Sequence, residues 1–503
     1  MQVKEILREL KLGNSVAEED KDLENYFVET DTFRSLIDDE NDIIAGDKGT
    51  GKTALYKILM NRAKSTKSLK KVEILTAFNP TGSNVFQQLA RDEVLTEGQY
   101  STVWKAYILS LVGNWLLETL GDLQEPKMVK LDTLLKQLKL RVADDSPKNV
   151  FRNLLETIKH FVRPKKAAID FKFNESGMPT AISPNIEFGN TSETKPEKDE
   201  IEIVSHTDSL GLLNDALEEM DVTVWIVLDR LDEAFQGYPK TEIPALRALL
   251  RTYLDLKEFD RLKLKLFVRR DLFRKITQGE QGFVNLTHIN ARKKEIFWEN
   301  DDLLNLLIQR VKANDGFVKT LKLQDKTAKE IFYILFPDQV DLGQRRAKTW
   351  NWMLSRIRDG NDVKPPRNLI DLVIKAQEQQ NRHEERVSRE FGAETSLITS
   401  EAVKTALSRL SDERVKDTLL AEAGKYSTHI EKFRGGKAEY NMESLVETLN
   451  MPNDDVRGVI KVLVEMGFLE QTSETYKIPM LYRDGLEITQ GKAFQSEEVN
   501  DED

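Results

Sequence analysis

The stretch NDIIAGDKGTGKTAL, residues 41–55, decides the fold. Its centre, GDKGTGKT at 46–53, fits the pattern G-x-x-x-x-G-K-[ST] in full. A short apolar strand is predicted before this loop and a helix over about 53–62 after it. Glycines let backbone N–H groups turn inward around phosphate oxygens without a Cβ clash, and the helix directs its positive N-terminal end at them. The stretch therefore predicts a phosphate-binding loop between a strand and a helix.

Each residue type in this loop has an expected role. Lys52 is expected to reach the β- and γ-phosphates and to act in catalysis, and the Thr53 hydroxyl is expected to ligate Mg²⁺. We expect the cofactors ATP and Mg²⁺. A chance match is the alternative, and the predicted strand and helix around the motif count against it. The residues predicted to hold the nucleotide are Gly46, Asp47, Lys48, Gly49, Thr50, Gly51, Lys52 and Thr53.

A second group of acidic residues ends another apolar run. Residues 224–235 read VWIVLDRLDEAF. Asp229 ends the predicted strand, where an aspartate can hold Mg²⁺, mostly through water. One of the next two acids can orient the attacking water or accept its proton. We choose Glu233 as this base and Asp232 as the second choice; alternatively, both begin a solvated helix.

Strands alternate with helices over the first 300 residues. Strands are predicted at 71–78, 222–229 and 262–268, and the uninterrupted apolar run at 222–229 suits the centre of a parallel sheet. This alternation predicts an α/β fold with a mainly parallel sheet. Asp229 lies 177 residues after Lys52, so we interpret 83–200 as a large insertion of helices and a β-hairpin, either a partner-binding element or a scaffold.

The chain beyond about 298 has an almost purely helical pattern. Two helices at about 442–449 and 454–466, followed by a short two-stranded hairpin, look like a winged helix. The full organisation that we predict is a helical leader at 1–40, a core with the phosphate loop at 41–297, a helical lid at 298–395, a winged-helix domain at 396–492 and an acidic disordered tail at 493–503.

Composition excludes several kinds of site. The chain has no cysteine, so disulfides and thiolate metal sites are excluded. Its formal net charge of −11 gives no bulk attraction to nucleic acid or anionic membranes.

The most apolar stretch, 107–120, is shorter than the roughly 20 residues of a membrane-spanning helix, and the N-terminus lacks the apolar region of a signal peptide. We therefore expect a cytoplasmic protein without a membrane partner.

The motifs together carry a resemblance to known ATPases. The D-x-x-D-E pattern at 229–233 resembles the extended Walker B motif of NACHT-type STAND ATPases. The order of phosphate loop, Walker B, sensor 1, sensor 2 and winged helix resembles the origin-recognition type of AAA+ ATPase. It also resembles bacterial P-loop ATPases that include phage-defence proteins. This resemblance implies a P-loop NTPase that binds and hydrolyses ATP.

The resemblance also implies roles for residues outside the two Walker motifs. Arg269 and Arg270 end the strand at 262–268, where sensor 1 touches the γ-phosphate or the attacking water; the alternative is a pair of surface charges. Arg367, in PPRNLID at 365–371, resembles the sensor 2 arginine that projects from the lid. Tyr26–Val28 lies where such ATPases hold the adenine ring, although an aromatic side chain on a core face is the commoner case.

The charge of the C-terminal domain argues against reading of a DNA sequence. Residues 441–490 contain nine acidic and four basic residues, a net charge of −5. A helix entering the major groove normally carries net positive charge. A regulatory or protein-binding winged helix is therefore the better interpretation.

Four functions remain open. The first two are an ATP-driven machine in bacterial genome or phage defence, with an effector or a nucleic acid, and a STAND-like switch. The others are a loader resembling replication initiators and a scaffold that binds ATP without turnover. Such ATPases often act as oligomers, in which a neighbour supplies an arginine. We expect a homo-oligomer or a partner chain, with Arg247, Arg251 and Arg261 as candidates for that arginine.

Replacement of Lys52 by alanine tests the phosphate loop. We expect Lys52→Ala to abolish productive ATP binding, because it removes the lysine that reaches the β- and γ-phosphates. Isothermal titration calorimetry with ATP and Mg²⁺ measures this, with Lys64→Ala as the control outside the motif. Unchanged ATP affinity and turnover in Lys52→Ala would place the nucleotide elsewhere.

Overall fold

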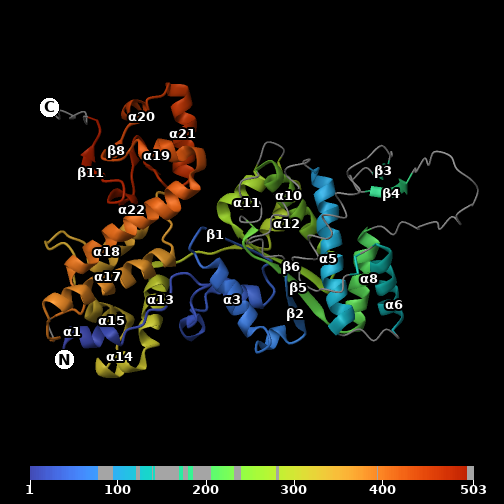
Figure 1. The fold of residues 1–503 in the computed structure, drawn as a ribbon, viewed down its shortest axis with the longest axis horizontal. Helices are drawn as coiled ribbons and strands as arrows, with labels where there is room; N and C mark the ends of the chain where they lie inside the picture. The colour runs from blue at the N-terminus through green and yellow to red at the C-terminus, as the bar shows by residue number, and fades with distance from the viewer. Residues whose placement is uncertain are drawn as a thin grey trace, which may run out of the picture. The chain divides into compact units, whose positions relative to one another are not determined.

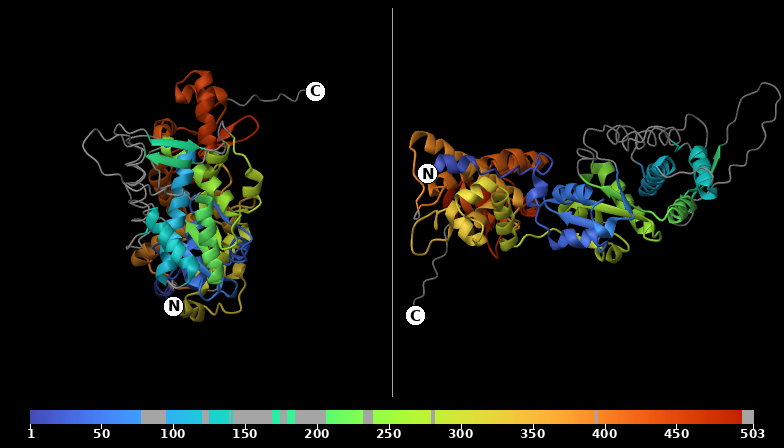
Figure 2. Two further views of the ribbon diagram at one scale, coloured as in Figure 1. Left: turned by 90° about the vertical axis from the view of Figure 1, so that its right-hand side faces the viewer. Right: turned by 90° about the horizontal axis from the view of Figure 1, so that it is seen from below.

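The computed structural model describes most of the chain. The described residues are 1–77, 95–119, 125–138, 140–141, 169–173, 179–184, 206–231, 239–278, 282–392 and 395–494. They form two compact units (Figures 1 and 2). We call Glu29–Gly46 with Leu55–Ile296 the sheet unit. We call Met1–Val28, Asp47–Ala54 and Phe297–Asp503 the C-terminal unit.

The sheet unit is built on five parallel strands, as the alternating pattern predicts. The strand order is β2-β5-β6-β1-β7, and every neighbouring pair is parallel. Strands β5 and β6 lie inside the sheet, and their apolar runs are buried, which confirms the interpretation of 222–229 as an interior strand. The bounds are β1 Ile43–Gly46, β2 Val72–Thr76, β5 Thr223–Leu228, β6 Leu262–Arg269 and β7 Lys293–Glu295.

Helices of this unit share one apolar core with the sheet. Helix α5 packs against α10 and α8, and the Trp104 indole N–H donates to the Ala245 carbonyl over 2.9 Å. Since α5 falls within the predicted insertion, that part of the insertion belongs to the core. The helices are α2 Asp31–Ile37, α3 Lys52–Arg62, η2 Lys67–Leu69, α5 Glu97–Thr119, α6 Pro126–Gln137, α8 His206–Glu219, α10 Pro239–Leu256, α11 Arg270–Thr277 and α12 Leu286–Asn290.

The predicted β-hairpin in the insertion is present. Strands β3 (Ile169–Phe173) and β4 (Pro179–Pro184) pair antiparallel, in the two-stranded sheet that the sequence predicts around 174–177. The second strand begins at Pro179, two residues before its predicted start at 181, and residues 185–189 of the predicted range lie outside the described residues. The alternating pattern therefore locates the hairpin but not the start of its second strand.

The C-terminal unit is mainly helical and has its own core. Helix α17 packs along α18, and α1 packs against α17. The helices are α1 Val3–Arg8, η1 Leu23–Tyr26, α13 Asn300–Lys312, α14 Asp315–Thr320, α15 Ala328–Leu335, α16 Thr349–Ile357, α17 Pro366–Arg386, α18 Ser400–Glu413, η4 Gly424–Tyr426, α19 Ser427–Glu431, α20 Met442–Leu449, α21 Asn453–Glu465 and α22 Met480–Arg483. The predicted helical leader is divided, because α2 belongs to the sheet unit and α1 and η1 do not.

A small four-stranded sheet lies near the C-terminus. Its order is β11-β8-β10-β9, and β9 and β10 pair antiparallel after α20 and α21, as predicted from the sequence. The bounds are β8 Lys437–Tyr440, β9 Glu470–Gln471, β10 Tyr476–Lys477 and β11 Thr489–Lys492. Before this sheet, α18 continues into a π-helix, η3, over Arg414–Leu420.

A network of charged side chains lies near the amino-terminal ends of β1 and β6. Lys265 on β6 is fully buried. Its ammonium lies 2.6 Å from Asp39 Oδ1 and 2.7 Å from Asp42 Oδ1. Arg292 Nε is 2.6 Å from Asp42 Oδ2, and the Tyr253 hydroxyl donates to the same oxygen over 2.9 Å. Burial acts to raise the pKa of Asp42, but Arg292 and Lys265 outweigh burial and lower it.

The two lysines of β6 provide a matched test of this network. We expect Lys265→Met to lower the free energy of unfolding by about 3–5 kcal/mol, because it removes the fully buried cation of the network and leaves Arg292 as the ion-pair partner of the buried Asp42. Lys263, two residues earlier, also pairs with Asp39, but its side chain is 32% exposed. For Lys263→Met we expect a loss of less than about 1 kcal/mol. Urea denaturation measures both values, and equal losses would contradict the network.

Candidate nucleotide site

Three strands of the sheet unit bring predicted site residues to one edge of the sheet. Strand β1 ends at Gly46, β5 is followed by Asp229, and β6 ends at Arg269. Because the strands are parallel, with β6 between β1 and β5, their carboxyl ends meet at the same edge. Asp229 is buried there, with 8% of its surface exposed. In open α/β sheets, this is the edge at which ligands bind.

The phosphate loop leaves that edge and forms a tight turn. Gly49 has φ +77° and Gly51 has φ +103°, backbone conformations that a residue with a Cβ rarely adopts. The Asp47 carbonyl accepts hydrogen bonds from the Thr50 hydroxyl at 2.8 Å and the Lys52 ammonium at 3.0 Å. Lys52 and Thr53 open helix α3, as the motif predicts. The predicted strand, glycine loop and helix are therefore all present.

The lid arginine predicted from the sequence lies against this loop within the C-terminal unit. The Arg367 backbone N–H donates to the Gly49 carbonyl over 3.4 Å. A Cβ added to Gly49 would lie 3.1 Å from Arg367 Cβ and 3.3 Å from Pro365 Cβ. Gly49 is thus required both by its φ and by the close approach of α17.

The Arg367 side chain has an unused donor. Its Nε is buried and has no hydrogen-bond partner among the residues that the structure describes. Burial lowers the pKa of the Arg367 guanidinium, and the positive charge of Arg414 lowers it further. A buried donor without a partner costs free energy, and a phosphate oxygen would satisfy it. The arrangement suits recognition of an anion beside the loop.

Two contacts to the loop were not predicted from the sequence. The Trp298 indole N–H donates to the Thr50 carbonyl over 2.8 Å. Lys48 forms an ion pair with Glu422, 374 residues away in the chain. In the sequence, the only signal for Trp298 is an aromatic residue shortly after a predicted strand. Glu422 lies in a stretch whose charges are those of an ordinary helix. Neither pattern identifies a partner of the loop.

The predicted sensor 1 arginines lie at the end of β6. Arg269 makes two hydrogen bonds of 3.0 Å to the Asp271 carboxylate. Burial acts to raise the pKa of Asp271, and Arg269 more than offsets this, so the pKa is lowered. Arg270 lies 3.7 Å from Glu295. These bonds hold the Arg269 guanidinium beside Asp271 at the end of β6.

The two candidates for the catalytic base, Asp232 and Glu233, lie outside the described residues. Their neighbour Asp229 is described, and its negative charge adds to burial in raising the pKa of the Tyr56 hydroxyl on α3. The Asp229 carboxylate is thus close enough to α3, the helix that follows the phosphate loop, to act on Tyr56.

Arg247 is not available as an arginine finger, which corrects the sequence prediction. Its side chain is buried and donates to the Ile276 carbonyl over 2.9 Å and to the Gly282 carbonyl over 2.6 Å. These bonds join α10 to α11 and to the segment that follows α11. Arg251 is half-exposed and pairs with Glu97, and Arg261 is 3.4 Å from Asp221. Both remain candidates.

Tyr26 is a buried structural residue in this fold, which agrees with the alternative of an aromatic side chain on a core face. Its ring is covered by the Arg310 guanidinium, 4.3 Å from the ring centroid. Its hydroxyl donates to Asp20, which also pairs with Arg310 at 3.1 Å. Only 5% of the residue is exposed. An adenine ring would have to displace Arg310 to stack there.

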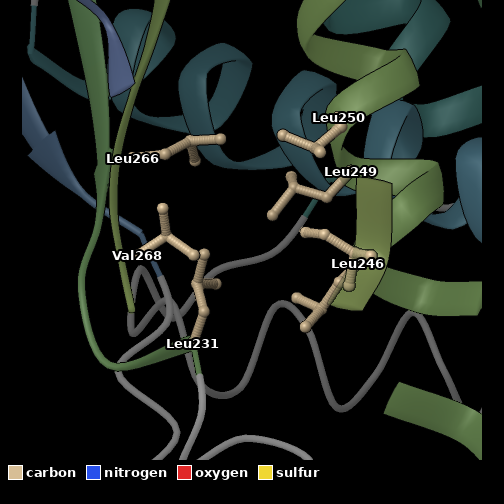
Figure 3. Close-up of a pocket in the computed structure, with 7 residues that line it drawn as sticks. Leu231, Leu246, Leu249, Leu250, Leu266 and Val268 are labelled. Carbon is tan, nitrogen blue, oxygen red and sulfur yellow. The ribbon is translucent and has the colours of Figure 1, made fainter. Parts of the chain in front are cut away.

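One further cavity in the described part of the chain is too small and too apolar to hold a nucleotide. A cavity behind β6 is lined only by apolar side chains (Figure 3), among them Leu231, Leu249 and Val268. Its volume of about 10 Å³ is at the limit for one water molecule. Among the described residues, no three His, Asp or Glu side chains gather as a metal site. None of the described helices is long and apolar enough to span a membrane.

Replacement of Arg367 tests its proposed contact with the γ-phosphate. We expect Arg367→Ala to bind ADP as the parent does and ATP more weakly, reducing the ratio of the two affinities several-fold. The control is Arg382→Ala, an exposed arginine on the same helix. Calorimetry with ATP and ADP gives both affinities. An unchanged ratio would reduce Arg367 to a packing residue.

One comparison with known proteins agrees with the origin-recognition resemblance. Residues 14–193, which contain the phosphate loop, match the model of the ORC-CDC6-like family. This match supports an origin-recognition type of AAA+ P-loop ATPase. The chain is also 24% identical over 313 residues to the "Putative transposon gamma-delta 80.3 kDa protein" of Escherichia coli K12. The alignment covers 60% of this chain and 39% of that protein, so the chain spans about two-fifths of the relative's length.

Two solved structures from Aeropyrum pernix are distant matches. The ORC1 protein in complex with DNA is 12% identical, with a TM-score of 0.36, over 94% of this chain and 96% of that chain. The ORC2 protein with ADPNP and ADP is 11% identical, with a TM-score of 0.35, over 90% of this chain and 89% of that chain. The description of the fold therefore rests on the parallel sheet and the loop geometry of this chain itself.

Proposed function

We propose that this chain binds and hydrolyses ATP as an AAA+-type nucleotide-dependent switch. The observation that carries the proposal is the complete phosphate loop, turned at Gly49 against the first turn of α17 with Arg367 beside it. A loop that only joined a strand to a helix would have no need of a lysine, a threonine and a lid arginine in these positions. The family match over 14–193 points to the same activity.

The roles follow from the chemistry of phosphoryl transfer, which depends on positioning and on neutralisation of charge. Lys52 contacts the β- and γ-phosphates, and Arg367 donates to the γ-phosphate. Thr53 and Asp229 would hold Mg²⁺, which neutralises phosphate charge when it is bound. Glu233 orients and deprotonates the attacking water, with Asp232 as the second choice. The turn at Gly49 and Gly51 aims backbone N–H groups at the phosphates.

The biological setting is proposed in two forms. The first is a switch in bacterial genome or phage defence, acting with an effector protein or a nucleic acid. The second is an ATPase that resembles replication initiators and binds DNA, which the family match favours. We propose that α20, α21 and the β9–β10 hairpin form a winged helix. Its net charge of −5 over 441–490 favours a protein partner for this domain.

A matched pair of carboxylate variants tests catalysis. We expect Glu233→Gln to keep ATP affinity and to lose at least a hundredfold in turnover, because an amide cannot accept the proton of the water. Asp232→Asn should keep most of its turnover. Calorimetry and a phosphate-release assay measure the two quantities. If Asp232→Asn is inactive and Glu233→Gln is not, the two roles are exchanged.

The same assays separate the switch from the alternative of a scaffold. A scaffold would bind ATP but release no phosphate above the rate of the Glu233→Gln variant. Addition of duplex DNA to the same assay separates the two biological settings, because an initiator-like ATPase should respond to DNA and a protein-directed switch should not.

A further inference from the structure

The phosphate loop is anchored by three separate segments of the C-terminal unit. The Trp298 side chain binds the Thr50 carbonyl, and the first turn of α17 binds the Gly49 carbonyl. The Glu422 carboxylate pairs with Lys48. Consecutive residues of the loop are thus tied to elements that lie far from it in the sequence. A change in any of these elements is therefore transmitted to the loop.

Glu422 follows an unusual helical segment. Helix α18 becomes the π-helix η3 at Arg414, and Glu422 comes two residues after η3 ends. Arg414 donates to the Asn368 side chain over 2.7 Å and pairs with Asp371, both on the first turns of α17. Segment 414–422 therefore holds the start of the lid helix at one end and the phosphate loop at the other. π-helical turns occur often at functional sites.

The charge of Glu422 opposes the proposed ligand. A carboxylate beside a loop that takes a triphosphate is unfavourable, and Lys48 offsets it by forming the ion pair. The side chains of Lys48 and Glu422 are 41% and 29% exposed, so the pair contributes little to stability. An ion pair of this strength can break, and the Lys48 ammonium can then bind a phosphate oxygen instead of Glu422.

We propose that Glu422 is a positioning residue that competes with the nucleotide phosphates for Lys48. Glu422 lowers the affinity for ATP and links that affinity to segment 414–422. This inference rests on the proposed ATP binding by the phosphate loop. By thermodynamic reciprocity, ATP loosens segment 414–422, and a partner that draws this segment away raises the affinity for ATP.

The test is a double-mutant cycle on ATP affinity, measured by calorimetry with full-length protein, ATP and Mg²⁺. We expect Glu422→Gln to bind ATP about two- to fivefold more tightly, since an exposed ion pair contributes at most about this factor. We expect Lys48→Gln to bind more weakly. Added to Lys48→Gln, the Glu422→Gln change should have little effect, because no ammonium remains to be released.

Glu413→Gln is the matched control, because Glu413 ends α18 and pairs with Lys375 at 2.8 Å instead of with the loop. It removes the same charge and should leave ATP affinity unchanged. Hydrogen exchange gives a second readout. Amides of 414–422 should exchange faster when a non-hydrolysable ATP analogue binds to the parent, and this change should shrink in Glu422→Gln. Thermal unfolding should be nearly the same for all variants.

The outcomes separate this inference from the proposed function. If the parent protein does not bind ATP, both fail. If the parent binds ATP but Glu422→Gln has the same affinity, the inference fails and the ATPase proposal stands. If Glu422→Gln tightens ATP binding equally with and without Lys48, the Glu422 carboxylate acts by repelling the negative charge of ATP. Competition for Lys48 is then rejected.

Discussion

The structure depends on the turn of the phosphate loop between Gly46 and Lys52. Two of its residues, Gly49 and Gly51, have positive φ, and atoms of Pro365 and Arg367 lie within 3.4 Å of where a Cβ of residue 49 would stand. A side chain at Gly49 would therefore strain the backbone and push away the start of α17 at once. The absence of a side chain at Gly49 therefore allows both the turn of the loop and the close approach of Arg367.

Much of the candidate site could be predicted from the sequence because its signals are local. The phosphate loop, the strand that ends at Asp229 and the Pro-Arg start of α17 each need only a few neighbouring residues to be recognised. Long-range contacts gave no such signal. The alternating run LKLKLFV places Lys263 and Lys265 alike, yet Lys265 is buried because Asp39 and Asp42 lie against it. The sequence pattern of β6 contains no trace of that pairing.

The sequence interpretation considered functional roles for residues whose partners were unknown. Arg247 and Tyr26 both have chemistry that suits a nucleotide site. In the structure, each contacts groups that are distant in the sequence. Arg247 donates to two carbonyl oxygens, and the Arg310 guanidinium covers the Tyr26 ring. Arg367 differs, because its Nε lacks a partner among the described residues. An unsatisfied donor beside a phosphate loop is stronger evidence of function than the type of residue alone.

In the sheet unit, the charged residues that stabilise the fold and the candidate site residues lie at opposite ends of the strands. Side chains around the amino-terminal halves of β1 and β6 form the closed network of Lys265, Asp42 and Arg292, in which each charge faces an opposite charge. The carboxyl ends of β1, β5 and β6 instead present Gly46, Asp229 and Arg269, which suit a phosphate and a metal ion. Because Asp42 directly precedes β1 and Lys265 lies on β6, their ion pair favours the register observed between these two strands. That register decides where the phosphate loop begins, because the loop starts at the last residue of β1.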